Sequence, residues 1–414
     1  MKSDLERLMT ERGLDALLIT GPGMNNPAMV YFTGVTMLTA ADLIIRRGEA
    51  PVLFYQPMER DSAAKTGLQR VSYLRYPLTS LLKETGGSRT RARGLRYAHM
   101  FSGLGMETGR VAVYGAAEIG PVFGALMELR SRLPGLELVG EADDSLLFQT
   151  RATKDPTEVD RIRRMGQVTT QVVDELIDYL TTRSVKDDCL VDSAGAPLKL
   201  GVVKRMIDGW LSERGAETPE ETIFSIGRDA AVPHNPGNPE DRLRLGQTIV
   251  LDIFPREKGG GYFYDFTRTW CLGYATDEAQ ALYEQVRQVY REMSSAVQPG
   301  ALGSNLQAQT CGLFEVMGHP TLRTDVNTEQ GYVHGLGHGV GLNIHEMPFL
   351  THTAGELDVI LPGSVVTVEP GLYYPERGMG VRLEDTLWVS PEGKAAPVVE
   401  YPMELVLPIR GFSS

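Results

Sequence analysis

The chain has 414 residues, 42% hydrophobic and 23% charged, which is an ordinary globular composition but a length too great for one ordinary core. The formal net charge of −12 is spread along the chain with basic residues interleaved, which argues against a nucleic-acid surface or a polybasic membrane anchor. No apolar run reaches the roughly 18 to 20 residues that cross a bilayer, and the start lacks the apolar core of a signal peptide. We therefore expect two domains, a cytoplasmic location, no membrane association and no nucleic-acid partner.

The first 150 residues alternate short apolar runs with helical segments. Residues 4–13 have helical periodicity and stop at Gly13, after which DALLIT predicts a short buried strand. Further strands are predicted at ADLIIRR, APVLFY, GRVAVYG and LELVG, with a helix at PVFGALMELRSRL between the last two. This alternation indicates an α/β domain of about 150 residues.

The stretch TRATKDPTEVDRIRRMGQ carries a strong helix start. Asp155 can cap the helix, Pro156 suits its first position and Glu158 completes a capping box. We place the domain boundary between residues 152 and 153 and expect a helix of about 25 residues to run toward Leu180. Strands and turns follow, interrupted by predicted helices at 201–215, 277–296 and 306–317.

The three cysteines are Cys189, Cys271 and Cys311. They lie far apart, form no CxxC pair and leave an odd count. We therefore expect reduced, mostly buried thiols rather than disulfides.

Five residues of the types that bind metal ions occur in β-rich segments of the last 165 residues, each of which contains glycine or lies close to one. These segments are IVLDIF, YFYDFTRTW, HGLGHGVGLNIHE, TVEPGLYY and VRLEDTLWV, and four of them place an acid at or beside the end of a β-branched or aromatic run. An unpaired buried carboxylate costs several kcal/mol or more, so such acids need a neutralising partner. A divalent metal is the obvious one, and the candidate ligands are Asp252, Asp265, His338, Glu369 and Glu384.

The first two candidates flank a turn that contains Gly259, Gly260 and Gly261. The segment is predicted to form a β-hairpin that sets Asp252 and Asp265 on adjacent strands, where they can share a pair of metal ions. The alternative is a structural role in salt bridges, for which the nearby basic partners are Arg256 and Arg268.

The segment HGLGHGVGLNIHE holds three of the seven histidines, His334, His338 and His345. Its four closely spaced glycines exclude a stable helix, so the HxxxH spacing is not a helical zinc motif and a strand and loop are predicted. A lone histidine is more often structural, and a lone glutamate such as Glu369 before Pro-Gly is usually a strand end. Four carboxylates with one imidazole, however, suit Mn²⁺, Co²⁺, Fe²⁺ or Zn²⁺, and two-metal sites activate water for hydrolysis.

In combination these motifs resemble the pita-bread metallopeptidases of family M24, in the branch of Xaa-Pro dipeptidases (prolidases) and Xaa-Pro aminopeptidases. The resemblance covers nearly the whole chain and rests on DFTRT, HGLGHGVGL, VEPGLY and VRLED, with GLDALLIT, VYFTGV and RATKDPTEVDRIRR in the first half and at the junction. It implies a mixed α/β (α+β) protein with a smaller creatinase-type domain at 1–152 and a pita-bread catalytic domain at 153–414. It also implies a homodimer.

The resemblance further implies two divalent metal ions per subunit, Mn²⁺ before Co²⁺, Zn²⁺ or Fe²⁺. Asp252 would bind one metal, His338 and Glu369 the other, and Asp265 and Glu384 would bridge both. Glu369 would also act as the proton shuttle.

Four further residues receive roles from the same resemblance. His345 would stabilise the tetrahedral intermediate, and His234, in AAVPHNPGNPEDR, would position the substrate for catalysis. His334 would line the substrate pocket, and Arg382 would orient the carboxylates. The alternatives are that His234 is only a loop histidine and Arg382 only a salt-bridge partner.

Three departures from the family pattern bear on the active site and its substrate. The interval between Asp252 and Asp265 is longer than usual, and Phe254 stands where a glycine commonly follows the first ligand. After His345-Glu346 the chain continues Met-Pro-Phe349, without the basic residue that grips the free carboxylate in many dipeptidases. Dipeptide specificity would then need an arginine from elsewhere, such as the amino-terminal domain of a partner subunit.

Three classes of function follow. The leading hypothesis is an exopeptidase that cleaves the bond before proline in dipeptides or short peptides; the single small amino-terminal domain favours a dipeptidase, and an Xaa-Pro aminopeptidase is the alternative. The second class is a non-peptidase on the same scaffold, such as a lyase for a small sulfonium compound or a hydrolase of a cyclic amidine. The third is a binding module that has lost catalysis. The presence of all five candidate ligands argues against this class.

Overall fold

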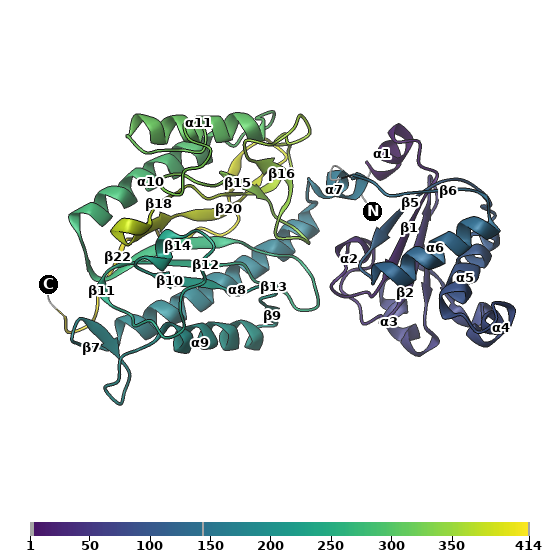
Figure 1. Ribbon diagram of the computed structural model, residues 1–414, viewed down its shortest axis with the longest axis horizontal. Coiled ribbons are helices and arrows are strands. Elements are labelled where there is room, and N and C mark those ends of the chain that lie inside the picture. Colours follow the sequence, from purple (N-terminus) through teal and green to yellow (C-terminus); the bar gives the residue numbers. More distant parts are fainter. Residues whose placement is uncertain (1–3, 143–144, 413–414) are drawn as a thin grey trace. The chain divides into compact units, whose positions relative to one another are not determined.

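The structure is a computed structural model that describes residues 4–142 and 145–412. It divides into two compact units, the first with residues 1–150 and Gly259–Gly261, the second with the rest of the chain (Figure 1). Within the described ranges, no helix is long and apolar enough to cross a membrane.

The first unit is built on a six-stranded mixed sheet in the order β4-β3-β2-β1-β5-β6. Strands β1, β2 and β3 pair antiparallel, and the remaining neighbours pair parallel. The strands are β1 (Ala16–Gly21), β2 (Ala41–Arg46), β3 (Val52–Tyr55), β4 (Gln69–Ser72), β5 (Thr108–Gly115) and β6 (Gly135–Val139).

Helices cover both faces of this sheet, because its central strands are apolar on both sides. Leu18 packs into a core with α4, α5 and α6, whereas its neighbours Leu17 and Ile19 pack into a second core with α1, α2 and α3. The helices are α1 (Leu5–Glu11), α2 (Pro27–Thr33), α3 (Arg60–Lys65), α4 (Leu78–Glu84), α5 (Arg89–Gly103), α6 (Ile119–Arg132) and α7 (Leu146–Arg151), with 3₁₀ turns at Pro57–Glu59 and Tyr73–Arg75.

The second unit is built on a ten-stranded sheet whose main path runs β10-β12-β14-β20-β17-β15-β16. Strands β11 and β22 pair with β14, and β21 pairs with β20. These strands are β10 (Ile223–Ile226), β11 (Leu245–Gly246), β12 (Thr248–Ile253), β14 (Phe266–Ala275), β15 (Gly337–Gly339), β16 (Glu346–Leu350), β17 (Val365–Val368), β20 (Glu384–Val389), β21 (Ala395–Pro397) and β22 (Val406–Leu407). Three small ribbons are β7 (Ser184–Lys186) with β8 (Cys189–Val191), β9 (Ala216–Glu217) with β13 (Arg256–Glu257), and β18 (Gly371–Tyr374) with β19 (Met379–Arg382).

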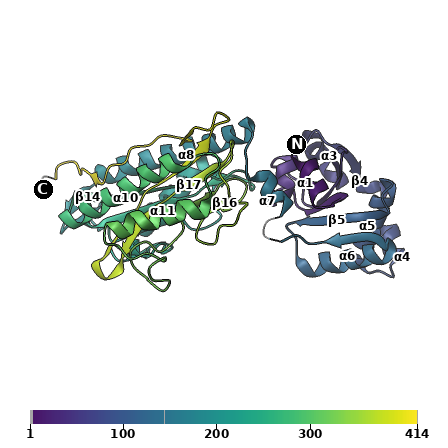
Figure 2. The ribbon, with the colours of Figure 1, turned by 90° about the horizontal axis from the view of Figure 1, so that it is seen from above.

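Two pairs of helices pack against this sheet, α8 with α9 and α10 with α11 (Figures 1 and 2). The helix α10 packs its apolar face, including Leu282, Val286 and Val289, against strand residues such as Val366 and Leu387. The helices are α8 (Pro156–Thr181), α9 (Leu200–Glu213), α10 (Asp277–Ala296) and α11 (Gly303–Val316), with 3₁₀ turns at Asp229–Ala231 and Pro375–Arg377.

The predicted elements are confirmed to within a few residues. The long helix α8 has 26 residues and begins with the expected capping box, in which Asp155 and Glu158 each accept from the other's backbone N–H. The glycine-rich histidine segment forms only the three-residue strand β15 and a loop, as predicted. The three cysteines are buried and free.

Candidate metal centre

The register of the large sheet brings residues from three strands into one row across β12, β14 and β20. Asp252 lies opposite Thr267, and Thr267 lies opposite Glu384. On the next strand, β17, Val368 pairs with Asp385, so Glu369, the residue that follows β17, continues this row beside Glu384. Directly opposed side chains are about 4.5–5.5 Å apart at Cβ, which is close enough for the carboxylates of Glu384 and Glu369 to share a ligand, whereas Thr267 lies between Asp252 and Glu384.

A second row lies two residues further along these strands. The backbone N–H of Asp265 donates to Thr386 Oγ1 at 3.2 Å, Thr386 lies opposite Thr367, and the N–H of His338 donates to Thr367 Oγ1 at 3.0 Å. Because side chains two residues apart point to the same face of a strand, both rows share one face of the sheet. The fold therefore gathers five residues that span more than 130 positions of sequence.

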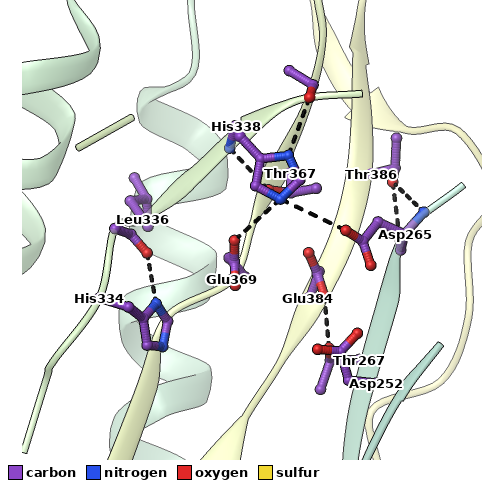
Figure 3. Close-up of polar contacts among 12 residues, drawn as sticks. Asp252, Asp265, Thr267, His334, Leu336, His338, Thr367, Glu369, Glu384 and Thr386 are labelled. Carbon is purple, nitrogen blue, oxygen red and sulfur yellow. Dashed lines mark hydrogen bonds and ion pairs between the residues drawn. The ribbon is translucent and has the colours of Figure 1, made fainter. Parts of the chain in front are cut away.

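The ligand atoms of these residues converge. His338 Nε2 lies 3.5 Å from Glu369 Oε1 and 3.6 Å from Asp265 Oδ2, contacts drawn as dashed lines in Figure 3. Asp265, His338 and Glu384 each offer a ligand atom, and these three atoms lie within 4.8 Å of one another. Two carboxylate oxygens, Asp252 Oδ1 and Glu384 Oε1, are buried without a hydrogen-bond partner. Buried oxygens of this kind cost free energy unless a cation satisfies them.

The charges at the centre repel one another in the metal-free protein. Burial, together with the neighbouring carboxylates, raises the pKa of Glu384 and of Asp265 well above the ordinary range. Burial raises the pKa of Glu369 to about 8, with Asp252 adding to the rise and Arg382 opposing it. Burial, with His345 nearby, lowers the pKa of His338 to about 3, which keeps its imidazole neutral as a metal ligand must be.

This donor set fits divalent metal. Four carboxylates and one neutral imidazole converge, two of their oxygens lack partners, and the groups repel one another until positive charge is supplied. The structure therefore contains a site that fits a divalent metal ion. The assignment of individual ligands and the number of ions stay predictions.

Three threonines that the sequence reasoning missed hold the ligands in place. Thr267 donates to Glu384 Oε2 at 2.6 Å, Thr386 Oγ1 donates to the carbonyl oxygen of Asp265 at 2.8 Å, and Thr367 Oγ1 accepts from the N–H of His338 at 3.0 Å. The signal was available, because a threonine stands two residues from an acid in DFT, TVE and EDT and so shares its face of the strand. The same alternation separates Glu384, at the centre, from its neighbour Asp385, which pairs with Arg268.

The two arginines of the hairpin, Arg256 and Arg268, form salt bridges with partners other than Asp252 and Asp265. Arg268 pairs with Asp385 at 2.9 Å and Arg256 with Glu217 at 2.9 Å. The cation beside Asp252 is instead Arg382, which arrives from β19 and lies 2.6 Å from Asp252 Oδ2. The interpretation of Arg256 and Arg268 as partners of the two aspartates is therefore wrong.

Arg382 is itself held firmly. It is 2% exposed, and its Nη1 donates to Tyr373 Oη at 2.8 Å and to the carbonyl oxygen of Pro233 at 3.3 Å. The hydroxyl of Tyr373 also lies 2.8 Å from His334 Nε2. Arg382 thus links Asp252 to the wall of the pocket that contains His334.

A cavity of about 300 Å³ opens onto all five predicted ligands, and a neighbouring one of about 290 Å³ shares three of them. His234 and His345 line both cavities, and the rings of His345 and His338 are 4.3 Å apart at their centroids. His334 and Arg382 line the second cavity. The structure therefore brings every predicted site residue to one place, and their catalytic roles stay predictions.

Added metal should oppose the loss of stability that the metal-free protein shows as pH rises. The pKa of the Glu369 carboxyl is near 4.5 in the unfolded chain and about 8 in the folded, metal-free protein. Below pH 4.5 the carboxyl is protonated in both the folded and the unfolded protein, but between pH 4.5 and about 8 the folded protein binds this proton more tightly. Stability is then lost as pH rises through this interval. The depressed pKa values of His338 and His334 act in the opposite sense, losing stability as pH falls below about 6.5, so the carboxylate effect is cleanest between pH 6.5 and 8.

We expect urea midpoints of the chelator-treated protein to fall from pH 6.5 to 8 and those of the Mn²⁺-loaded protein to rise relative to them, because metal binding requires deprotonated ligands. Glu369→Gln should flatten the metal-free profile. Parallel curves with and without Mn²⁺ would contradict a carboxylate metal site.

Two family models match the chain. One, described as metallopeptidase family M24, matches residues 160–391, and the other, described as the creatinase/prolidase N-terminal domain, matches residues 2–131. The Xaa-Pro dipeptidase of Pyrococcus furiosus is 25% identical over 403 residues, which cover 95% of this chain and 97% of that protein. A Mycobacterium tuberculosis protein named "Probable dipeptidase PepE" is 29% identical over 306 residues, 72% of each chain.

Solved structures share the fold. A dipeptidase from Pyrococcus horikoshii OT3 superposes with a TM-score of 0.74 at 22% identity, covering 97% of this chain and 98% of the other. An X-Pro aminopeptidase from Thermotoga maritima MSB8 gives a TM-score of 0.74 at 20% identity, covering 97% and 99%. The mixed α/β architecture with a smaller first domain is therefore confirmed.

Proposed function

Since the chain belongs to metallopeptidase family M24, we propose that it is an exopeptidase that uses divalent metal to hydrolyse the bond before proline in Xaa-Pro dipeptides. Residues 153–414 would carry the chemistry, in a homodimer. The observation that carries the proposal is the pair of rows on one sheet face, with Asp252, Asp265, His338, Glu369 and Glu384 around one cavity. Similarity to proteins named Xaa-Pro dipeptidase adds support.

We assign Asp252 to one metal ion, His338 and Glu369 to a second, and Asp265 and Glu384 to both, with Mn²⁺ ahead of Co²⁺, Zn²⁺ or Fe²⁺. Bound metal would supply Lewis-acid polarisation of the scissile carbonyl and would acidify water. Each assignment is compatible with the orphaned oxygens of Asp252 and Glu384.

The protein's own groups would handle the protons and the developing charge. Glu369 would accept a proton from the attacking water and pass it to the leaving proline nitrogen. His345 would donate a hydrogen bond to the oxyanion, and its position beside His338 supports this role. His234, which lines both cavities, would position the substrate together with His334.

The cavity is suited to a small peptide with a free amino terminus. Its volume of about 300 Å³ is at the low end for ligand pockets, which favours a dipeptide or tripeptide over a folded protein. Glu220 and Glu221 line it; Glu221 already pairs with Lys204, and the carboxylate of Glu220 can attract an α-ammonium group.

A second candidate, an Xaa-Pro aminopeptidase, is favoured by the absence of a free cation. In the described lining of both cavities the sole lysine or arginine is Arg382, whose guanidinium already faces Asp252. Phe349 lies directly opposite His338 in the sheet and lines the second cavity, where a basic residue would be needed to grip a dipeptide carboxylate. A longer peptide has no carboxylate at this position and needs no such residue.

The test compares three substrates with the Mn²⁺-loaded protein: Leu-Pro, Leu-Pro-amide and Leu-Pro-Gly, with Leu-Ala as the control without proline. A dipeptidase should prefer Leu-Pro and lose most activity on the amide, because the amide lacks the carboxylate. An aminopeptidase should prefer the tripeptide and accept the amide. Glu369→Gln, assayed in parallel, identifies contaminating activity. Hydrolysis of none of these by metal-loaded protein would refute the proposal and favour a non-peptidase on this scaffold.

Replacing His345 by alanine should separate catalysis from metal binding. We expect full metal content and a kcat lower by roughly 10²–10³, because one oxyanion donor contributes about 2.7–4 kcal/mol. The matched control is His352→Ala, which removes an exposed histidine of the same unit and should leave kcat unchanged. The measurements are metal analysis and steady-state kinetics of each variant. An unchanged kcat in His345→Ala would exclude His345 as the donor to the oxyanion.

A further inference from the structure

Three arginines of the amino-terminal unit lie on one face of helix α5. Arg89, Arg93 and Arg96 follow the i, i+4, i+7 spacing of a single helical face. Like charges at this spacing destabilise a helix by a few tenths of a kcal/mol per pair unless anions compensate them. Within residues 4–142 and 145–412, none of the three has a carboxylate within salt-bridge distance.

The guanidinium groups are held by other contacts. Arg93 donates from Nε to Tyr97 Oη and from Nη2 to Thr20 Oγ1, both at 2.8 Å. The guanidinium of Arg96 stacks 4.4 Å from the ring centroid of Tyr73, and its buried Nε has no hydrogen-bond partner. A buried donor of this kind needs an acceptor that the described protein does not provide.

One carboxylate lies at this place, and its hydrogen bonds are already made. Asp42, which is 4% exposed, accepts from Thr20 Oγ1 at 2.6 Å, from Tyr73 Oη at 2.5 Å and from Tyr97 Oη at 3.1 Å. Hydroxyl groups therefore separate Asp42 from Arg93, and two positive charges remain in excess locally, in a chain whose net charge is −12.

These groups surround a cavity of about 230 Å³, the arginine pocket, lined by Asp42, Gln56, Tyr73, Arg89, Arg93 and Arg96 with three small or apolar neighbours. The cavity is smaller than the roughly 300–1,000 Å³ of pockets for drug-sized ligands. Guanidinium groups bind planar or tetrahedral oxyanions through paired charge-assisted hydrogen bonds.

We propose that the arginine pocket binds a small oxyanion, the phosphate or carboxylate group of a small molecule, through Arg89 and Arg96. The anion would accept from the guanidinium groups of Arg89 and Arg96, which donate no side-chain hydrogen bond within the described residues, and it would relieve the repulsion along α5. The site belongs to the amino-terminal unit and needs none of the metal ligands.

The test is calorimetric titration of the metal-loaded protein with inorganic phosphate and with acetate, with KCl holding the ionic strength constant within each titration. We expect saturable binding of at least one of the two anions, and weaker binding in a titration at higher KCl concentration. Arg89→Gln/Arg96→Gln should weaken it about ten- to a hundredfold, because hydrogen bonds to charged groups are strong. Arg130→Gln, which removes the same charge from the exposed side of α6, should leave it unchanged.

Absence of saturable binding by either anion would overturn the proposal. So would unchanged affinity in the double variant, since the anion would then bind elsewhere, for example at the metal centre. If the double variant does not fold, Arg89→Glu decides, because Arg89 is exposed and its replacement leaves the core intact. Unchanged affinity in that variant would equally refute the site.

Discussion

Replacing Asp265 by asparagine is expected to abolish metal binding and activity while making the metal-free protein more stable. Asparagine keeps the acceptor for the N–H of Phe266, at 3.0 Å, but removes the charge that Asp252 and Glu369 repel. The loss of a predicted bridging ligand should lower kcat/KM by more than the 10- to 100-fold typical of residues that only support ligands. The metal-free variant should unfold at a higher urea concentration than the parent protein at pH 8, because burial and the neighbouring carboxylates disfavour the charged form of Asp265.

Metal analysis and peptide hydrolysis check the expected losses of metal and activity. Urea unfolding in chelator, on the same preparation, checks the expected gain in stability. Asp358→Asn is the matched control, since this buried aspartate accepts from two backbone N–H groups, of Phe349 and Gly355, at 2.8 Å each. Its replacement should leave metal content unchanged and cost about 1 kcal/mol, because one N–H loses its acceptor. An Asp265→Asn protein that retains metal and activity would refute the site.

Replacing Arg268 by methionine should give the largest loss of stability outside the metal centre. Its side chain is fully buried, pairs with Asp385 at 2.9 Å and donates to the carbonyl oxygens of Pro402, Tyr401, Thr267 and Glu384. Methionine leaves a buried carboxylate without its cation and four carbonyls without this donor. Removing one partner of a buried pair costs about 3–5 kcal/mol.

Urea unfolding followed by circular dichroism measures this loss. Arg377→Met is the control, because Arg377 and Glu278 form an ion pair in which both side chains are 58% exposed, and such pairs contribute about 0–1 kcal/mol. Arg268→Met/Asp385→Asn should regain part of the stability, since the uncompensated charge is gone. A loss below about 1 kcal/mol in Arg268→Met would contradict the importance of this pair.

Most of the secondary structure could be predicted from local patterns. The Asp155 capping box, the two-sided apolar runs of the first sheet and the glycines around His338 each act within a few residues of sequence. The nature of the site was equally accessible, because aspartate and glutamate at the ends of apolar strands require neutralisation wherever they meet.

The prediction was less complete for pairwise contacts. The hairpin was expected to set Asp252 and Asp265 on adjacent strands, and β12 and β14 are neighbours, but the pattern did not predict that Thr267 is the residue opposite Asp252. Arg256 and Arg268 were the nearest cations in sequence, yet Asp252 pairs with Arg382, 130 residues away. Nearness along the chain is a poor guide here, because each of these strands has two faces and two neighbours.

By itself the sequence determined many of the helices and strands, though not α5, together with the residue types that bind metal and the family to which they belong, since caps, periodicity and motifs are local properties. Only the tertiary structure decided which threonine supports which acid, that Glu384 and not Asp385 faces the centre, and which arginine lies beside Asp252. The reason is register. A shift of one residue turns every side chain of a strand to the opposite face, and packing of the whole ten-stranded sheet sets that register.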